Sequence, residues 1–277
     1  MARGRAGRVL LLLPVLAYTV FSAGPYLWTA MMSLRTTDEI HRSHYGLPIP
    51  AHWGKYHRAW TEFGYATYFR NSAIVTVMAV ILVTVLGAMA AFAFARRRYA
   101  FPGREPLFLL VFLSIMFPPQ IMLLALFQIL VQYKLFNTLT GLVLVYVATE
   151  LPLTIYLLRA FFAQIPAELE EAARLDGCGD WSLFWRVMLP MALPAVATTV
   201  ILNLIYFWNE FLYAVVFITR QQSRTLPLAI QFLVSDQYFD IGMLATGLMI
   251  ATLPVLVLYL FLSEWFVKGM TAGAIKG

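Results

Sequence analysis

The chain has 277 residues, of which 61% are hydrophobic and only 12% are charged, whereas a soluble domain carries roughly 25% charged residues. This composition excludes an ordinary soluble protein and predicts an integral membrane protein. The formal net charge of +6 does not indicate nucleic-acid binding, because the basic residues flank the apolar segments and form no soluble patch.

Six apolar segments each have the roughly 20 residues that a helix needs to cross a bilayer. They predict spans at about residues 9–32, 71–94, 106–131, 139–162, 191–218 and 242–267. The first segment is too long for a signal peptide and lacks a convincing cleavage site, so we interpret it as an uncleaved span. Most lysines and arginines then lie on the side of the N-terminus, which the positive-inside rule identifies as the cytoplasm. We expect one all-α transmembrane domain over residues 1–277, with both termini cytoplasmic.

The first external segment, about residues 35–70, carries aromatic residues at helical spacing. Trp53, Tyr56, Trp60 and Phe63 predict a helix that lies at the membrane surface. All four histidines of the chain are in the same segment, but their spacing has no firm ligand pattern and carboxylate partners are few. We therefore expect no metal site.

Polar residues inside the later apolar segments are candidates for a solute pathway. Pro118 and Pro119 remove two backbone donors from the third span, which is compatible with a simple kink or with a pathway lining. A charged residue at the centre of a span costs ~2.5–3.5 kcal/mol, so Glu150 and Glu210 should face the bundle, a partner subunit or water. The full set of candidates is Gln120, Glu150, Asn203, Trp208, Asn209 and Glu210.

These pathway candidates have two interpretations. Amides and aromatic rings suit the hydroxyl groups and ring faces of a sugar. The same side chains can also join helices or subunits, since polar bonds across membrane helices contribute ~0.6–2 kcal/mol. For Glu210 the structural interpretation is slightly favoured.

The longest polar interruption in the second half of the chain lies between the fourth and fifth spans, at residues 163–190. Pro166 suits the start of a helix, and the glutamates that follow suit its positive end. Gly177 can supply a left-handed C-terminal residue. Asp180 or Ser182 can cap a second short helix, which Pro190 would close. We predict a helix, a turn and a second helix between two spans.

Within this loop, Glu171-Ala172-Ala173 is followed by Asp176-Gly177 and then by Leu189-Pro190. This pattern resembles the EAA loop of ABC importer permeases. The resemblance implies that the loop docks into a cleft on a cytoplasmic ATPase subunit. The residues that would carry this coupling are Glu171, Ala172, Ala173, Asp176, Gly177, Leu189 and Pro190.

The C-terminal tail, residues 268–277, gives a second resemblance. Within it, residues 269–277 have the sequence GMTAGAIKG, which is similar to the ending of the second permease subunit of maltose-type carbohydrate importers, with Met270 and Ile275 as conservative departures. In that family the tail reaches into the ATPase dimer interface. The residues that would contact the ATPases are Thr271, Ala272, Gly273, Lys276 and Gly277.

The two resemblances imply a type I importer permease fold that pairs with a second homologous permease subunit. The expected partners are two cytoplasmic ATPase subunits, an extracytoplasmic solute-binding protein and the lipid of a bacterial or archaeal inner membrane. No GxxxxGK[ST] sequence occurs, so ATP and magnesium would be bound by the ATPases and this chain needs no cofactor.

The function that follows is the import of a sugar or a sugar-like solute, without bond chemistry in this chain. A different cargo such as a glycerophosphodiester stays open. A secondary carrier driven by an ion gradient is a rival class, but it typically shows inverted repeats and none is evident. A membrane-embedded enzyme would need clustered nucleophiles or metal ligands, and the sequence shows none.

Overall fold

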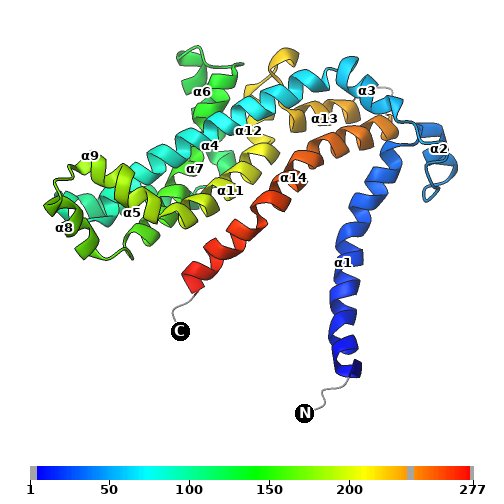
Figure 1. Ribbon diagram of the computed structural model, residues 1–277. Helices are drawn as coiled ribbons and strands as arrows, with labels where there is room; N and C mark the ends of the chain where they lie inside the picture. Colours follow the sequence, from blue (N-terminus) through cyan, green and yellow to red (C-terminus); the bar gives the residue numbers. More distant parts are fainter. Residues whose placement is uncertain (1–4, 236–239, 275–277) are drawn as a thin grey trace. The chain divides into compact units, whose positions relative to one another are not determined.

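The computed structural model describes the backbone of residues 5–235 and 240–274, and every regular element in these ranges is a helix (Figure 1). The chain forms two compact units. The first contains Met1–Thr67 and Ala229–Pro254, and the second contains Tyr68–Leu228 and Val255–Gly277.

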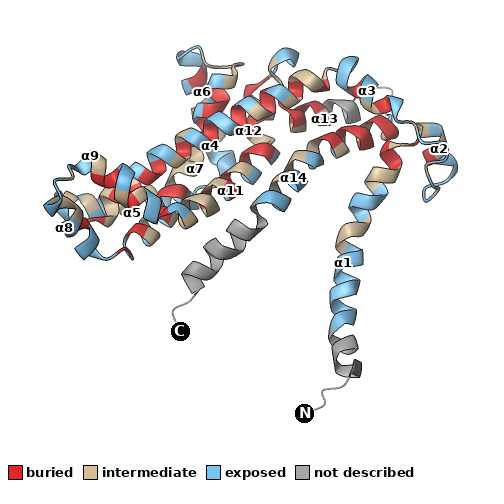
Figure 2. Ribbon diagram, viewed as in Figure 1, coloured by how far each residue is buried: buried red, intermediate tan, exposed pale blue. Residues whose placement is uncertain are grey.

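The first unit contains α1 and two short helices, together with the beginning of the last helix. Their bounds are α1 Arg5–Ser33, α2 Thr37–Arg42, α3 Gly54–Thr61 and α14 Ile241–Ala274. Thr36 and Glu39 form a capping box at the start of α2, in which each side chain accepts a hydrogen bond from the other residue's backbone N–H. Figure 2 shows that α1 exposes most of its described side chains. The short helix predicted from aromatic spacing is α3.

A buried lysine fixes α3 within this unit. The Nζ atom of Lys55 donates a hydrogen bond of 2.6 Å to the carbonyl oxygen of Arg35. Burial lowers the pKa of Lys55 from 10.5 to about 8, although Asp240 and Glu39 oppose this shift. Gly242 lies so close that a Cβ atom there would collide with Lys55 Nζ and with the Arg35 carbonyl. Close packing therefore holds this charge away from water.

The second unit is built around α4, α7 and α11, with bounds Tyr65–Ala95, Leu139–Phe162 and Leu193–Asn209. Buried residues of all three helices, including Val83, Leu142 and Phe207, form one hydrophobic cluster. A second cluster joins the later part of α4 and α7 to the loop that follows α7. The helix α7 coincides with the predicted fourth span, and α4 begins six residues before the predicted second span.

The expected third span, 106–131, is not one helix. It consists of α5 Arg104–Leu113, the 3₁₀ turn η2 Ser114–Met116 and α6 Pro119–Gln132, and the two halves are bent by 106°. Phe117 has φ −78° and ψ 123°, the extended conformation that a following proline favours. The two prolines therefore break the helix, which is a larger effect than a kink.

The expected fifth span, 191–218, is also divided. The helix α11 ends at Asn209, and α12 Leu212–Phe217 follows after a break at Glu210, whose ψ is 131°. The side chain of Glu210 accepts hydrogen bonds from the backbone N–H groups of Tyr213 and Ala214 at 2.7 and 3.2 Å. It thereby satisfies donors that a new helix start leaves open.

Three helices of the described residues are each long and apolar enough to cross a membrane: Tyr65–Ala95, Leu139–Phe162 and Ile241–Phe261. Two bent pairs pass the same test together, namely Arg104–Met116 with Pro119–Gln132 and Asp180–Met191 with Leu193–Asn209. Three to five spans are thus supported by length and composition. The arrangement of six spans stays a prediction.

The predicted external loop 219–241 contains η4 Gln221–Ser223 and α13 Leu226–Ser235. Asn71, which lies inside α4, donates through Nδ2 to the carbonyl oxygens of Gln222 and Arg224 at 2.8 and 2.9 Å. Ser72 accepts a hydrogen bond from the N–H of Leu226. These two polar residues therefore hold the start of the loop against α4.

Candidate functional site

The predicted coupling loop forms a hairpin of short helices. The first, α8 Ala167–Leu175, follows Pro166 and has acidic residues in its first turn. It ends at Leu175, and Gly177, which follows the C-cap residue Asp176, has a φ of +85°. The N–H of Gly177 bonds to the carbonyl of Arg174, and the N–H of Cys178 bonds to that of Ala173. This is a Schellman ending, which needs the left-handed conformation that glycine adopts without strain.

The second half of the hairpin differs from the prediction in two ways. The first helical residue of α9 Asp180–Leu183 is Asp180, and neither Asp180 nor Ser182 caps it, because Gly179 is the N-cap. Pro190 does not close the helix. The chain passes through a π-helical turn, η3 Phe184–Met188, into α10 Leu189–Met191. Pro190 lies in the first turn of α10, where its missing N–H is tolerated.

Arg174 joins the two helices of the hairpin. Its Nη2 atom lies 2.7 Å from Asp180 Oδ1 and 3.1 Å from Glu170 Oε1, and it donates to the hydroxyl oxygen of Tyr99 at 3.2 Å. The hydrogen bond from Arg174 is the main reason that the pKa of Asp180 lies below its ordinary value. Burial is the main reason that the pKa of Tyr99 is raised.

Arg96 ties the hairpin to the end of α4. In the sequence, Arg96 indicates only that this end of the span is cytoplasmic. In the structure its side chain is buried, with an exposed fraction of 7%. Its Nη1 atom donates to the carbonyl of Ile165 at 3.0 Å, and its Nε atom lies 3.5 Å from Glu170 Oε2. Because Glu170 pairs with both arginines, one carboxylate connects α4 to α8. Only the fold reveals this role, since Arg97, Arg98 and Arg104 carry the same sequence signal.

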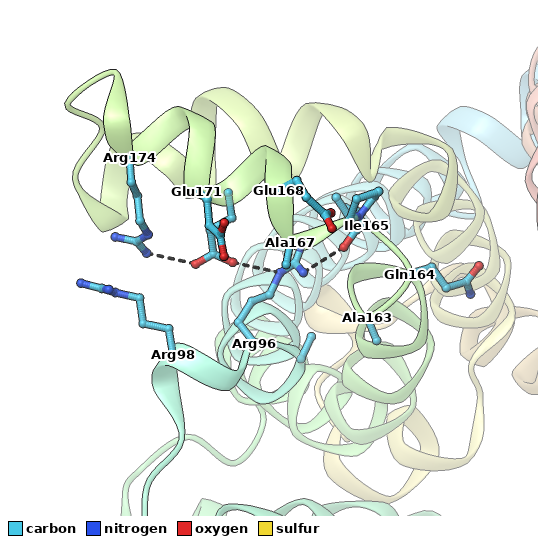
Figure 3. A pocket seen from close by; sticks show the side chains of 12 residues that line it. Arg96, Arg98, Ala163, Gln164, Ile165, Ala167, Glu168, Glu171 and Arg174 are labelled. Carbon is cyan, nitrogen blue, oxygen red and sulfur yellow. Dashed lines mark hydrogen bonds and ion pairs between the residues drawn. The ribbon is translucent and has the colours of Figure 1, made fainter.

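A cleft of about 630 Å³ lies between the end of α4 and the hairpin. Figure 3 shows Arg96 and Arg98 on one side of it and Arg174 on the other. Glu168, Glu170 and Glu171 also line the cleft. Its charges are therefore mixed, and its ion pairs connect the hairpin to the end of α4.

The predicted coupling residues do not all lie on one free surface. Glu171, Ala172, Asp176, Gly177 and Pro190 are exposed, whereas Ala173 and Leu189 pack against the second hydrophobic cluster. The sequence analysis missed two apolar residues that are much more exposed than Ala173 and Leu189: Leu175 is 89% exposed and Trp181 is 65% exposed. The sequence signal for them is an apolar side chain on either side of the predicted glycine turn.

The pathway candidates do not share one site. Glu150 is half-buried and lines a cavity of about 190 Å³ that also contains Tyr206 and the break between α5 and α6. Glu210 is buried, accepts a hydrogen bond of 2.6 Å from Tyr146 Oη and also accepts from two backbone N–H groups of α12. Asn203 is buried and donates to Thr154 Oγ1 at 3.0 Å.

None of the other five candidates lines this cavity. Trp208 is buried and packs edge-to-face on Phe69. The side chain of Asn209 donates to the carbonyl of Ile205, in its own helix. Gln120 is exposed near the start of α6. The fold therefore places one of the six candidates in the cavity.

The predicted ATPase-contacting tail lies largely outside the part that the structure describes. The helix α14 continues through Thr271, Ala272 and Gly273, but their side chains are not described, and Lys276 and Gly277 lie outside the described residues. In the residues that the structure does describe, no group of three or more His, Cys, Asp or Glu side chains is placed to hold a metal ion.

A helical fold with apolar spans, two broken helix pairs and a polar hairpin defines a multi-pass membrane component. Residues 83–272 match the family described as "Binding-protein-dependent transport system inner membrane component". The chain belongs to this family of ABC importer permeases, whose members are transporter subunits and not enzymes.

Several curated relatives cover nearly the whole chain. The probable ABC transporter permease YurM of Bacillus subtilis is 35% identical over 94% of this chain and 86% of its own length. The diacetylchitobiose uptake system permease NgcG of Streptomyces coelicolor is 37% identical, over 95% and 87%. The trehalose transport system permease SugB of Mycobacterium tuberculosis is 34% identical, over 91% and 92%.

A solved structure shares the fold. A chain of a bacterial ABC transporter that imports the acidic polysaccharide alginate aligns with a TM-score of 0.80 and 21% identity, over 96% of this chain and 99% of that chain. The similarity confirms the predicted importer permease fold.

Proposed function

We propose that this chain is one of two homologous permease subunits of an ABC importer that carries a sugar or sugar-like solute into the cytoplasm. The names of its relatives support the cargo class, because they specify diacetylchitobiose, trehalose and melibiose, raffinose or stachyose. The other partners in this proposal are two cytoplasmic ATPase subunits and an extracytoplasmic binding protein.

The observation that supports coupling is a hairpin that has ion pairs at its base and an exposed apolar tip. Its base is held by Arg96, Glu170 and Arg174, whereas most of the surface of Leu175 and Trp181 is exposed. A rigid base transmits force, and exposed large apolar side chains are typical of contact surfaces. We assign the tip to the ATPase, which would push on α8 when its dimer closes. The tail residues Thr271, Ala272, Gly273, Lys276 and Gly277 would contact the same partner.

The proposal is tested by the association of the ATPase subunits with the assembled complex. The complex is purified in detergent, and the dissociation constant of the ATPase is measured for the variants Leu175→Ser and Trp181→Ser. Truncation of a central contact residue typically costs 1–2 kcal/mol or more, so each variant should bind about tenfold more weakly. Leu47→Ser is a matched control, because Leu47 is 68% exposed in the predicted external segment. Unchanged ATPase binding by both hairpin variants would refute the assignment.

Cargo and topology need separate measurements. Proteoliposomes that contain the whole complex should accumulate a saccharide only when ATP and the loaded binding protein are present. Uptake of a glycerophosphodiester without uptake of any saccharide would refute the proposed sugar cargo and support the alternative. Tags at both termini should be reachable only after the inner membrane is permeabilised, because we place both ends in the cytoplasm.

A further inference from the structure

The cavity beside Glu150 has an unusual balance of hydrogen-bonding groups. Its wall contains one carboxylate, from Glu150, and the hydroxyl groups of Ser114, Thr149, Tyr206 and Tyr213. No lysine or arginine is among the described residues that line it. A solute in this cavity therefore meets one acidic group and no side-chain cation.

The hydroxyl protons of this wall are already used within the protein. Ser114 Oγ donates to the carbonyl of Val111 at 2.6 Å, and Thr149 Oγ1 donates to the carbonyl of Val145 at 3.0 Å. The hydroxyl of Tyr206 hydrogen-bonds to Glu150, and that of Tyr213 hydrogen-bonds to Thr149. Because each hydroxyl has one proton and two lone pairs, the capacity that remains is for accepting hydrogen bonds.

The broken helix on the same wall is also a poor anion site. A helix N-terminus normally attracts anions through its free N–H groups. Here α6 begins at Pro119 and follows Pro118, and proline has no backbone N–H. Two donors that an anionic solute would use at this helix start are therefore missing.

From this wall we infer that Glu150 is a charge filter for the transported solute. The filter accepts saccharides that offer hydroxyl, amide or ammonium donors, and it rejects saccharides that carry carboxylate, sulfate or phosphate groups. The inference rests on the proposed function, since it specifies which sugars can pass. Glu150 acts by its charge, and the surrounding hydroxyl oxygens receive the donors of the solute.

The sign of the potential in the cavity can be measured without knowledge of the cargo. Cys178 is the only cysteine of the chain, so Cys178→Ser gives a background into which Ser114→Cys places one thiol on the cavity wall. The assembled complex is treated with a cationic trimethylammonium and an anionic sulfonate methanethiosulfonate, in the resting and the ATP-trapped states. After correction for reaction with free cysteine, the cationic reagent should react about tenfold or more faster.

Removal of the charge should abolish this preference. In Glu150→Gln the two corrected rates should become nearly equal, whereas Glu150→Asp should retain most of the difference. Glu105→Gln is the matched control, because Glu105 is 58% exposed in its side chain and does not line the cavity. The control should leave the preference unchanged.

Three results would overturn the charge filter. The rate preference could persist in Glu150→Gln, neither reagent could react in any state, or Glu150→Gln could prevent assembly of the two permeases. The last result would make Glu150 an interface residue. Saccharide uptake by the complex with the unchanged chain is measured in parallel. If that complex imports no saccharide, the proposed function fails, while the reagent rates still decide the charge of the cavity.

Discussion

Replacement of Arg174 by methionine removes the side chain that joins the two helices of the hairpin. Methionine keeps an unbranched apolar stem of helix-compatible shape, so the change is mainly the loss of the guanidinium group. That group contacts Glu170, Asp180 and Tyr99 at 3.1, 2.7 and 3.2 Å. We expect α8 and α9 to separate more often from the rest of the second unit.

The contacts with Glu170 and Asp180 differ in strength. The side chain of Glu170 is 10% exposed, so its bond to Arg174 should contribute about 1.5–3 kcal/mol. Asp180 is 58% exposed, and solvent reduces such a pair to about 0.2–1 kcal/mol. Glu170 keeps Arg96 at 3.5 Å, which prevents the larger loss expected for an isolated buried charge. We therefore expect the free energy of local opening to fall by about 2–3 kcal/mol.

Hydrogen exchange of the backbone amides of α8 and α9 measures this opening. Because 1.4 kcal/mol corresponds to a factor of ten, exchange should become about 30- to 150-fold faster in Arg174→Met. Amides of α7 should be unaffected. Arg98→Gln is a matched control, since Arg98 lines the same cleft but is exposed, and its effect should stay within about 0.5 kcal/mol. Equal exchange in Arg174→Met and Arg98→Gln would refute the account of the hairpin.

Three further predictions concern other parts of the chain. Gly177→Val should strain the left-handed turn and lower ATPase stimulation in the assembled complex, whereas Gly179→Val, at a φ of −73° with open space around it, should retain it; equal effects would contradict the turn argument. Because the pKa of Lys55 falls from 10.5 to about 8, the unfolded segment binds more protons above pH 8. The protection of α3 against exchange should therefore rise between pH 8 and 10, and Lys55→Met should abolish the rise. Tyr146→Phe removes a buried hydrogen bond to the carboxylate of Glu210, so the free energy of unfolding should fall by about 1.5–3 kcal/mol. The midpoint of thermal unfolding should fall with it, and an unchanged midpoint would contradict this prediction.

The class of protein and the hairpin could be predicted from the sequence because the signals are local. Runs of about 20 apolar residues have few alternatives to membrane helices. Likewise, Gly177 in its family pattern specifies a left-handed turn without reference to distant contacts. The observed φ of +85° and the Schellman ending follow from that residue and its immediate neighbours.

The breaks in the predicted spans were only partly visible in the sequence. Pro118 and Pro119 predicted an interruption of the helix, but a bend of 106° depends on what the two helical halves pack against. The break at Glu210 has no proline. It occurs because one buried carboxylate can accept bonds from Tyr146 and from the start of α12 together.

By itself, then, the sequence determined a helical membrane chain, its polar hairpin and the residues that end that hairpin, because hydropathy and backbone conformation act over a few neighbouring residues. Only the tertiary structure decided which polar residues share a site. Glu150 and Glu210 have the same sequence signal, yet Glu150 lines a cavity and Glu210 is buried at a helix start. Arg96 and Arg98 are two residues apart, yet only Arg96 is buried against Glu170. These differences arise because burial and pairing depend on segments far apart in the chain, such as α4 and α8.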